Sequence, residues 1–448
     1  MSGTYRPPVS GLVPVLLLFL SPTLAAGPPS PPNLLIVTLD TTRADHLSCY
    51  GYPHPTSPNI DRIARGGVLF ESATTQIPLT GPAHASLMTS RHPRSHGAVR
   101  NGVPMRADVP TLAEVLRGHG YATGAFVSGW TLRRNLTGLD RGFDRFDDRL
   151  EDRYRVVNAQ RTADQATDLA LQWIGERKGR PFFLWVHYFD PHSPYRRHPE
   201  FYRLPAGGSS GRNEFGYPLE KVARYDSEIG FTDREIGRLL GAVDRSGTGP
   251  DTLVVITGDH GESFGDHGYV GHGRRVYEAN LHVPLIVRFP RNLPGGGRSS
   301  HPAQTIDVMP TVLALLGVPG PMGMEGRDLG PALRGTTDLP EPEIYFETFA
   351  GARKKFWRVF SPPLAGVPIR VGRRIGAWKY IYDPKTGEHE LYDLATDPAE
   401  TINRIRDHPE FLGLGRHCLD RHGNHGLRAD QALSQEDRRT LKSLGYLE

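Results

Sequence analysis

Three short apolar runs, each stopping abruptly at an acidic or turn residue, constrain the fold of this 448-residue chain more than any other feature. The runs are LLIVTL before Asp40, FFLWVHYF before Asp190 and TLVVIT before Gly258 and Asp259. Each is apolar at both alternating positions, which is typical of strands buried on both faces in a mainly parallel sheet. Because the carboxyl ends of such strands meet at one edge, we expect Asp40, Asp190 and Asp259 to lie at that edge.

Amphipathic patterns between these runs predict helices that cover the sheet. The patterns span residues 60–65, 111–117, 159–178 and 219–243. Strands and helices that alternate in this way indicate an α/β sandwich with a large, mainly parallel central sheet.

A change of composition marks a second region. After a Gly- and Pro-rich stretch at 317–335, residues 377–383 and 389–394 flank a turn and predict an antiparallel hairpin. We therefore expect a main domain at 33–335, followed by a small antiparallel subdomain and tail at 336–448.

The first 26 residues have the composition of a signal peptide. One charge, Arg6, precedes the apolar run 12–20 and a small-residue site ending at Ala26. The run is shorter than the roughly 20 residues that a spanning helix needs. We therefore expect cleavage near Gly27, no membrane span in the mature chain, and export to the periplasm or the extracellular space.

Charge and cysteine content restrict the partners only slightly. The formal net charge is +4, and no run of lysine and arginine interleaves with aromatics, so a nucleic-acid partner is not expected. Export would permit a disulfide between Cys49 and Cys418, and the sequence leaves that pairing open.

A hydroxyl at a predicted helix N-terminus is the first candidate for chemistry. Thr80 precedes Gly81, Pro82 and a run with helical composition, and proline is favoured in a first helical turn. Free backbone amides and the positive end of the helix dipole suit both a nucleophilic hydroxyl and the oxyanion formed by its attack. A plain threonine cap on a surface helix would give the same local pattern.

Two strand-end carboxylates and an imidazole predict a metal site. Asp40, Asp259 and His260 converge on the sheet edge, where two uncompensated carboxylates would repel each other. One divalent ion, also contacted by Thr80, would lower the pKa of the Thr80 hydroxyl. A histidine ligand favours Zn or Mn, with Ca or Mg as the alternatives.

Ordered motifs show that the chain resembles the sulfatase branch of the alkaline-phosphatase superfamily from about Asn33 to Arg404. The motifs are Asp40 with Ser48-Cys49-Tyr50-Gly51, Pro58-Asn59-Ile60-Asp61, Thr80 with Arg91-His92-Pro93, Asp190-Pro191-His192-Ser193-Pro194-Tyr195, Asp259-His260-Gly261-Glu262, Val283-Pro284-Leu285, Asp307-Val308-Met309-Pro310-Thr311 and Glu390-Leu391-Tyr392-Asp393-Leu394. The resemblance implies a sulfatase-like catalytic domain and metal-dependent hydrolysis of phosphate or sulfate esters.

The chain departs from the family pattern at the nucleophile. Typical sulfatases carry Cys or Ser in a Cys-x-Pro-x-Arg pattern that is oxidised to formylglycine, whereas this chain has Thr80 and His84. A threonine cannot give that aldehyde, so Thr80 would act as an alkoxide that forms a covalent ester. Thr41 replaces the second acidic ligand, and the sequence leaves open whether it ligates weakly or caps a turn. The Lys and His of the arylsulfatase anion clamp are also missing near Ser128, which favours phosphoesters over sulfate esters.

The resemblance also implies roles for five other polar residues. His192 matches the histidine that protonates the leaving group, and His272 stands where sulfatases place a lysine that contacts the anion. Asn101 and His84 are expected to bind the anion. His267 is a further candidate for substrate binding, although a loop histidine can equally hold its own backbone.

Two other functions stay open at this point. One is an exported phosphoryl-headgroup transferase of the same superfamily, and the other is a degenerate member that only binds an anion. In either enzymatic case the expected substrate is a small-molecule, glycan or lipid-headgroup ester. The sequence names neither that substrate nor the oligomeric state.

Overall fold

In the computed structural model, the three apolar runs form neighbouring strands of one sheet. β1 (Asn33–Leu39) pairs in parallel with β8 (Phe182–Tyr188) on one side and with β9 (Thr252–Gly258) on the other. The register sets Leu39 opposite both Tyr188 and Gly258, so the three strands end together. The predicted common edge is therefore confirmed.

The structure describes residues 1–5, 31–150, 152–154, 158–176, 179–204, 208–336, 339–349 and 368–420. Residues from Pro32 onward form one compact unit. Most of the predicted signal peptide and the tail after 420 lie outside these ranges. Within them, no helix is both long enough and apolar enough to cross a membrane. Cys49 and Cys418 carry free thiols.

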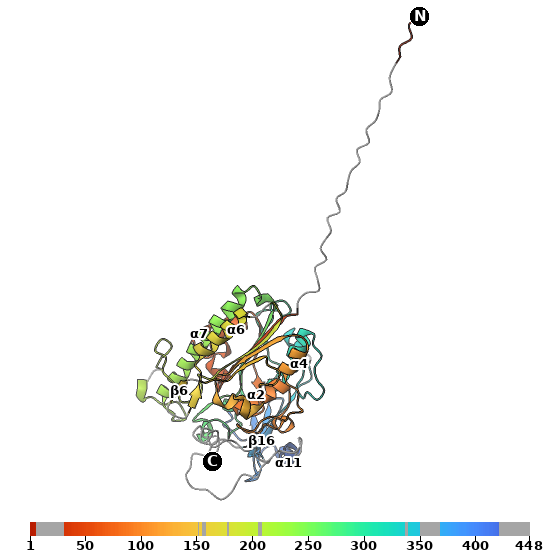
Figure 1. Cartoon of the computed structure of the whole chain (residues 1–448). Helices are drawn as coiled ribbons and strands as arrows, with labels where there is room; N and C mark the ends of the chain where they lie inside the picture. Colours follow the sequence, from red (N-terminus) through yellow and green to blue (C-terminus); the bar gives the residue numbers. More distant parts are fainter. Residues whose placement is uncertain are drawn as a thin grey trace. The chain divides into compact units, whose positions relative to one another are not determined.

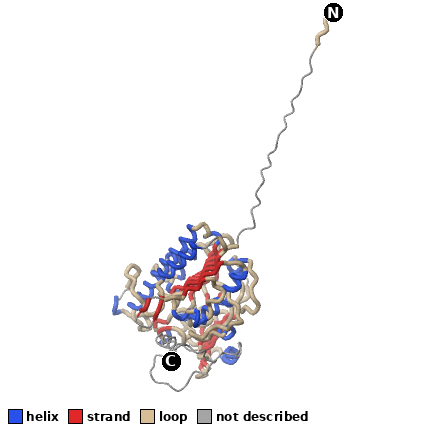
Figure 2. The backbone as a smooth tube through the Cα atoms, viewed as in Figure 1, coloured by secondary structure: helices blue, strands red, loops and turns tan. Residues whose placement is uncertain are grey.

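The central sheet has eight strands in the order β13-β2-β12-β9-β1-β8-β4-β5 (Figures 1 and 2). Only β12 runs antiparallel to its neighbours, so the sheet is mostly parallel. The remaining strands are β2 (Val68–Phe70), β4 (Ala122–Phe126), β5 (Arg145–Asp147), β12 (Leu285–Arg288) and β13 (Gly297–Ser299). This architecture confirms the predicted α/β fold.

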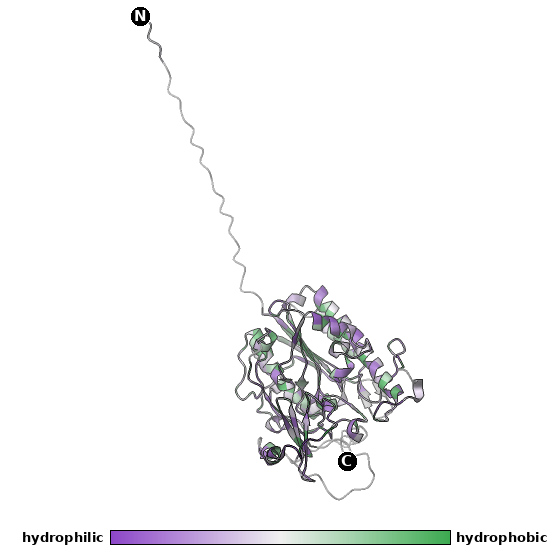
Figure 3. Cartoon of the chain, turned by 180° about the vertical axis from the view of Figure 1, so that it is seen from behind, coloured by the Kyte–Doolittle hydropathy of each residue, from purple (hydrophilic) through white to green (hydrophobic). Residues whose placement is uncertain are grey.

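Helices bury both faces of the sheet, because alternate strand residues face opposite sides. Leu34 and Ile36 pack in one cluster, whereas Leu35 and Val37 pack in the other. The first face is covered by α2 (Thr80–Thr89), α4 (Leu112–Gly118) and α9 (Val308–Leu316), and the second by α1 (Pro58–Arg65), α6 (Ala163–Glu176) and α7 (Leu219–Arg245). The long helix α7 has buried apolar residues such as Ile236 and Leu239 beside exposed Arg234 and Arg238, and Figure 3 shows both green and purple along it.

Side-chain hydrogen bonds explain where two predicted helices begin. Thr111 forms a capping box with Glu114 at the start of α4, which supplies partners to free amides of the first turn. α1 is capped from a distance, since the Asp233 carboxylate of α7 accepts from the backbone N–H groups of Asn59 and Ile60. The α1 cap also links two helices on the same face.

A four-stranded antiparallel sheet follows, in the order β15-β16-β17-β18. Its strands are β15 (Glu343–Thr348), β16 (Arg370–Ile375), β17 (Trp378–Asp383) and β18 (Glu388–Asp393), and the last two form the predicted hairpin. Lys379 of β17 is fully buried and pairs with Glu278 at 2.7 Å and Glu400 at 2.9 Å. The ion pair with Glu278 fixes the small sheet to the segment that leads into β12.

Candidate active site

The ends of β1 and β9 bring together the three predicted metal ligands. Asp40 follows β1, and Asp259 and His260 follow β9. One ligand atom of each lies within 4.8 Å of the others, and all three side chains are buried. Asp190 also stands at this edge, after β8, but its carboxylate belongs to a different cluster.

The hydrogen bonding of this group suits a divalent cation. Among the described residues, Asp40 Oδ1 and Asp259 Oδ2 have no hydrogen-bond partner despite being buried. His260 Nδ1 donates to the Gly261 carbonyl at 3.0 Å, which leaves the Nε2 lone pair toward the carboxylates. Burial raises the pKa of both aspartates, and for Asp259 the neighbouring Asp40 adds to the effect. Two orphan carboxylate oxygens and an imidazole lone pair are the donor set that Zn²⁺ or Mn²⁺ accepts.

Backbone donors hold the other Asp259 oxygen. Asp259 Oδ1 accepts from Thr41 N at 3.1 Å and from His260 N at 2.7 Å. Thr41 has a φ of 48°, and its hydroxyl donates to the Pro191 carbonyl at 2.9 Å. Thr41 thus connects the metal group, by which we mean Asp40, Asp259 and His260, to the loop that carries His192. Neither bond decides whether Thr41 is itself a metal ligand, which the sequence left open.

His187 supports Asp40 and was not anticipated. Its Nδ1 accepts from the Ser128 backbone N–H at 3.2 Å, so Nε2 carries the proton that faces Asp40 Oδ2 at 3.3 Å. Burial lowers the pKa of His187 to about 3, which keeps the ring neutral. A histidine that donates to a metal-binding carboxylate fixes the orientation of that ligand. The only signal in the sequence is a histidine inside an apolar strand.

Thr80 is the first residue of α2, as expected for the proposed nucleophile. The residue is fully buried, and its Oγ1 lies 3.4 Å from His260 Nε2. In the same turn, Gly81 N donates to Asn101 Oδ1 at 2.7 Å. The amide of Asn101 is therefore oriented, and within the described part of the chain its buried Nδ2 has no hydrogen-bond partner. The hydroxyl, the helix N-terminus and an unused amide donor thus lie together.

His84 lies beneath Thr80 in a fixed hydrogen-bond chain. Trp185 Nε1 donates to Thr38 Oγ1 at 2.9 Å, and that hydroxyl donates to His84 Nε2 at 2.9 Å. His84 Nδ1 in turn donates to the Thr80 carbonyl at 2.8 Å. Burial lowers the pKa of His84 to about 3. Both ring nitrogens are therefore engaged within the protein, and the expected anion contact of His84 stays a prediction.

Two further histidines gather around His260. The His272 ring centroid lies 4.5 Å from that of His260 and 5.1 Å from that of His192. His192 Nδ1 donates to the Ser193 carbonyl at 2.6 Å, and its ring stacks on Phe189. Burial lowers the pKa of His192 and of His272. The structure thus brings both predicted histidines to the metal group.

Glu262 orients His272 and was missed as a site residue. Its Oε1 accepts from His272 Nδ1 at 3.1 Å, and its Oε2 accepts from the Tyr195 hydroxyl at 3.1 Å. Although burial raises the pKa of Glu262, the neighbouring His272 lowers it overall, so the carboxylate stays ionised. Its position directly after Gly261 in the Asp-His-Gly-Glu motif was the available signal.

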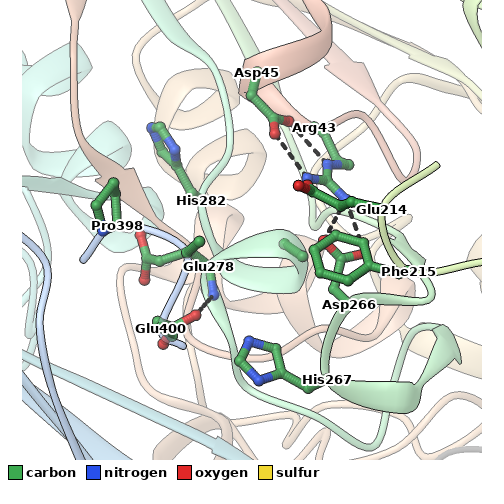
Figure 4. Close-up of a pocket in the computed structure, with 12 residues that line it drawn as sticks. Arg43, Asp45, Glu214, Phe215, Asp266, His267, Glu278, His282, Pro398 and Glu400 are labelled. Carbon is green, nitrogen blue, oxygen red and sulfur yellow. Dashed lines mark hydrogen bonds and ion pairs between the residues drawn. The ribbon is translucent and has the colours of Figure 1, made fainter. Parts of the chain in front are cut away.

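His267 lies in a separate pocket (Figure 4). Its ring stacks on Tyr277 with centroids 3.6 Å apart. The pocket has a volume of about 330 Å³, and its other walls include Arg43, Asp45, Asp266, Glu278 and Glu400. The ring contacts of His267, with Tyr277 and Tyr392, do not join it to Thr80 or the metal group, so its substrate role stays a prediction.

Comparisons with known proteins agree over most of the chain. Residues 32–318 match the family model Sulfatase, and residues 265–418 match the model N-sulphoglucosamine sulphohydrolase, C-terminal. Arylsulfatase A from Homo sapiens is 28% identical over 470 residues, which cover 87% of this chain and 86% of that protein.

Two solved structures show the same fold. The phosphonate monoester hydrolase of Agrobacterium radiobacter has a TM-score of 0.69 at 23% identity, covering 86% of this chain and 94% of that chain. A protein solved with its substrate D-glucosamine-2-N,6-O-disulfate has a TM-score of 0.68 at 21% identity, covering 88% of this chain and 97% of that chain.

Proposed function

This chain belongs to the sulfatase family of hydrolases, and on that premise we propose that it hydrolyses phosphate or sulfate esters with Thr80 as nucleophile and prefers phosphoesters. The observation that carries the proposal is the position of the Thr80 hydroxyl. It begins α2, 3.4 Å from His260 Nε2 and beside a group of buried ligands. A helix N-terminus stabilises the negative charge that develops during attack on an ester.

The proposed metal ligands are Asp40, Asp259 and His260. A divalent ion held there would lower the pKa of the Thr80 hydroxyl and offset charge on the reacting oxygens. The orphan oxygens of Asp40 and Asp259 support this assignment. His187 and the Thr41 amide would keep the two carboxylates in place.

The proposed chemistry has two steps. Thr80 Oγ, as the alkoxide, attacks phosphorus or sulfur, the bond to the leaving oxygen breaks, and His192, as the imidazolium, gives that oxygen a proton. Water then attacks the covalent Thr80 ester, His192 takes a proton from that water, and Thr80 Oγ leaves again as the alkoxide. Because His192 Nδ1 is held by a carbonyl, the transferred proton is assigned to Nε2. His272, oriented by Glu262, and Asn101 Nδ2 would bind the non-reacting oxygens.

The preference for phosphoesters follows from the second step. A Thr phosphate ester can be hydrolysed by in-line attack at phosphorus, whereas formylglycine exists in sulfatases to release sulfate without attack at sulfur. The cationic anion clamp is also replaced, since the corresponding segment offers the hydroxyls of Ser128 and Thr131. Both hydroxyl oxygens are buried, with no hydrogen-bond partner in the ranges that the structure describes. Neutral donors of this kind fit a singly charged group, which a phosphodiester, a phosphonate monoester and a sulfate ester all carry, so they favour these over a doubly charged phosphomonoester.

A substrate screen tests the proposal. The metal-reconstituted protein is offered matched aryl phosphodiesters, phosphonate monoesters, phosphomonoesters and sulfates, together with a glucosamine sulfate. We expect a phosphodiester or phosphonate monoester to be fastest and Thr80→Ala to remove that activity, while Thr89→Ala, at the other end of α2, retains it. A clear preference for sulfate, with unmodified Thr80 confirmed by mass spectrometry, would refute the phosphoester assignment. Metal binding without any turnover would instead favour the binding-only alternative.

We also propose that the mature protein is exported, on the composition of its first 26 residues. Its substrate would be a small-molecule, glycan or lipid-headgroup ester in that compartment. N-terminal sequencing of the mature protein, with fractionation of its host, tests both the cleavage near Gly27 and the location.

A further inference from the structure

A second group of ligand-type side chains lies outside the candidate active site. Asp190, at the end of β8, His198, in the loop that follows, and Glu228, in α7, each offer one atom within 4.8 Å of the others. None of the three belongs to the Asp40, Asp259 and His260 group. The proposed ester hydrolysis gives this second cluster no task.

The polar atoms of the cluster are buried and partly unused. Asp190 is 4% exposed and Glu228 is 1% exposed. Asp190 Oδ2 and His198 Nε2 have no hydrogen-bond partner among the residues that the structure describes, although both atoms are inaccessible to water. An unpaired buried carboxylate oxygen is costly unless something supplies the missing partner. Because one ligand atom of each residue lies within 4.8 Å of the others, one small partner could contact all three residues together.

Burial of the two carboxylates outweighs the positive charge that Arg196 brings to them. Arg196 is close enough to lower the pKa of both, and its backbone N–H donates to Glu228 Oε1. Burial nevertheless outweighs that arginine and raises the pKa of Asp190 to about 7, with Asp164 adding to the effect. With both carboxylates ionised, a single guanidinium leaves a net negative charge in a buried site.

The imidazole of His198 is held ready for ligation. Its ring stacks on Phe231, with centroids 4.1 Å apart and an interplanar angle of 10°. Its backbone N–H donates to Ser227 Oγ at 3.2 Å, next to Glu228. Burial lowers the pKa of His198, which favours the neutral ring that a metal requires. The ring is therefore oriented by contacts independent of the carboxylates.

We propose that Asp190, His198 and Glu228 form a second divalent-cation site, separate from the catalytic group, which takes Zn²⁺ or Mn²⁺. Two carboxylate oxygens and one imidazole nitrogen are a mixed donor set that suits these ions. The ion ties the loop after β8 to α7. Since Asp190 precedes His192 by two residues, that link also restrains the segment carrying the proposed general acid.

Metal counting on the whole purified protein tests this site. The protein is equilibrated with Zn²⁺ or Mn²⁺, freed of unbound ion by gel filtration and analysed by mass spectrometry of the elements. We expect about two ions per chain in the wild type, and one ion fewer in both Glu228→Gln and His198→Gln. His198 is only half-buried, so a substitution there disturbs folding less. His198→Gln therefore still tests the site if Glu228→Gln does not fold. Asp259→Asn should also lose one ion, but from the other site.

A matched control lies two turns further along α7. Glu235 is also buried, but its carboxylate pairs with Arg234 and Arg238, so Glu235→Gln should keep the wild-type metal content. The site is refuted if Glu228→Gln and His198→Gln bind as much metal as the wild type, whatever the total. A single bound ion that is lost in Asp259→Asn and kept in Glu228→Gln would refute it as well. If one ion is found and Glu228→Gln removes it, the second site stands and the catalytic metal assignment fails.

Discussion

Replacing Asp259 with asparagine should have opposite effects on stability with and without metal. Asparagine keeps an oxygen that can accept from the Thr41 and His260 amides, so the loop after β9 retains its hydrogen bonds. The substitution removes one of two carboxylates whose ligand atoms lie within 4.8 Å of each other. Without metal, that pair opposes folding because both charges are buried.

The magnitude follows from the separation of the charges. Two unit charges at 4.8 Å repel by about 3 kcal/mol at an effective dielectric constant of about 20. Since the pKa of both aspartates is raised, part of this repulsion is relieved by proton uptake. We therefore expect metal-free Asp259→Asn to have a free energy of unfolding about 1–3 kcal/mol above that of the metal-free wild type. At an ion concentration about 100 times Kd, the wild type should gain about 2.7 kcal/mol that the variant does not.

Denaturant unfolding, with chelator and with added Zn²⁺ or Mn²⁺, measures both effects. Asp307→Asn is the control, because both carboxylate oxygens of Asp307 already accept backbone bonds, from Gln304 and Arg327. It should destabilise the protein equally in both conditions. The reasoning is refuted if metal-free Asp259→Asn is no more stable than the wild type, or if added metal stabilises both proteins to the same extent.

Three further predictions concern two histidines of the site, His192 and His272, and the buried His96 at the end of α3 (Pro93–His96). His192→Ala should slow esters with poor leaving groups by about 10²–10⁴-fold and activated aryl esters much less; equal slowing of both would indicate a binding role. Glu262→Gln should lower kcat roughly tenfold or more by loosening His272, with unchanged metal content; unchanged kinetics would contradict the orienting role. Burial lowers the pKa of His96 to about 3 in the folded chain, whereas the same histidine has a pKa of about 6.5 in the unfolded chain. As the pH falls below about 6.5, only the unfolded chain binds a proton at His96, so the free energy of unfolding decreases. The stability deficit of His96→Gln, measured by denaturant unfolding, should therefore shrink by about 2 kcal/mol between pH 6.5 and 5, and a constant deficit would contradict this.

The main sheet could be predicted because its strands are buried on both faces. Apolar residues at every position distinguish such strands from amphipathic ones, and the residue that ends each run marks the functional edge. Helix ends were less well predicted, since the pattern at 159–178 corresponds to a helix over Ala163–Glu176. Tertiary contacts decide such ends, as with the distant Asp233 that caps α1.

Supporting residues could not be predicted from local patterns. His187 looks like part of a hydrophobic strand, and only the pairing of β1 with β8 brings it to Asp40. His84 was expected to bind the anion by analogy with the position of an arginine. A residue four positions after Thr80 lies over the Thr80 carbonyl, and the His84 imidazole bonds to it. That bond could not be predicted from the local pattern, and the anion contact of His84 stays a prediction.

The charges around Asp40 bear on which phosphoester the site should prefer. The groups that shift the pKa of Asp40 include His192, His260 and Glu262. A divalent ion would balance Asp40 and Asp259, while Glu262 stays ionised. A dianionic phosphomonoester would bring one more negative charge toward Glu262 than a monoanionic diester, at a cost of about 3 kcal/mol for a separation of roughly 5–6 Å. We therefore expect kcat/KM for an aryl phosphodiester to exceed that for the matching monoester by about 100-fold at a pH where the monoester is doubly ionised. The ratio should shrink at lower pH, as the monoester takes up a proton, and in Glu262→Gln; a ratio below one in the wild type would show that this balance of charges is wrong.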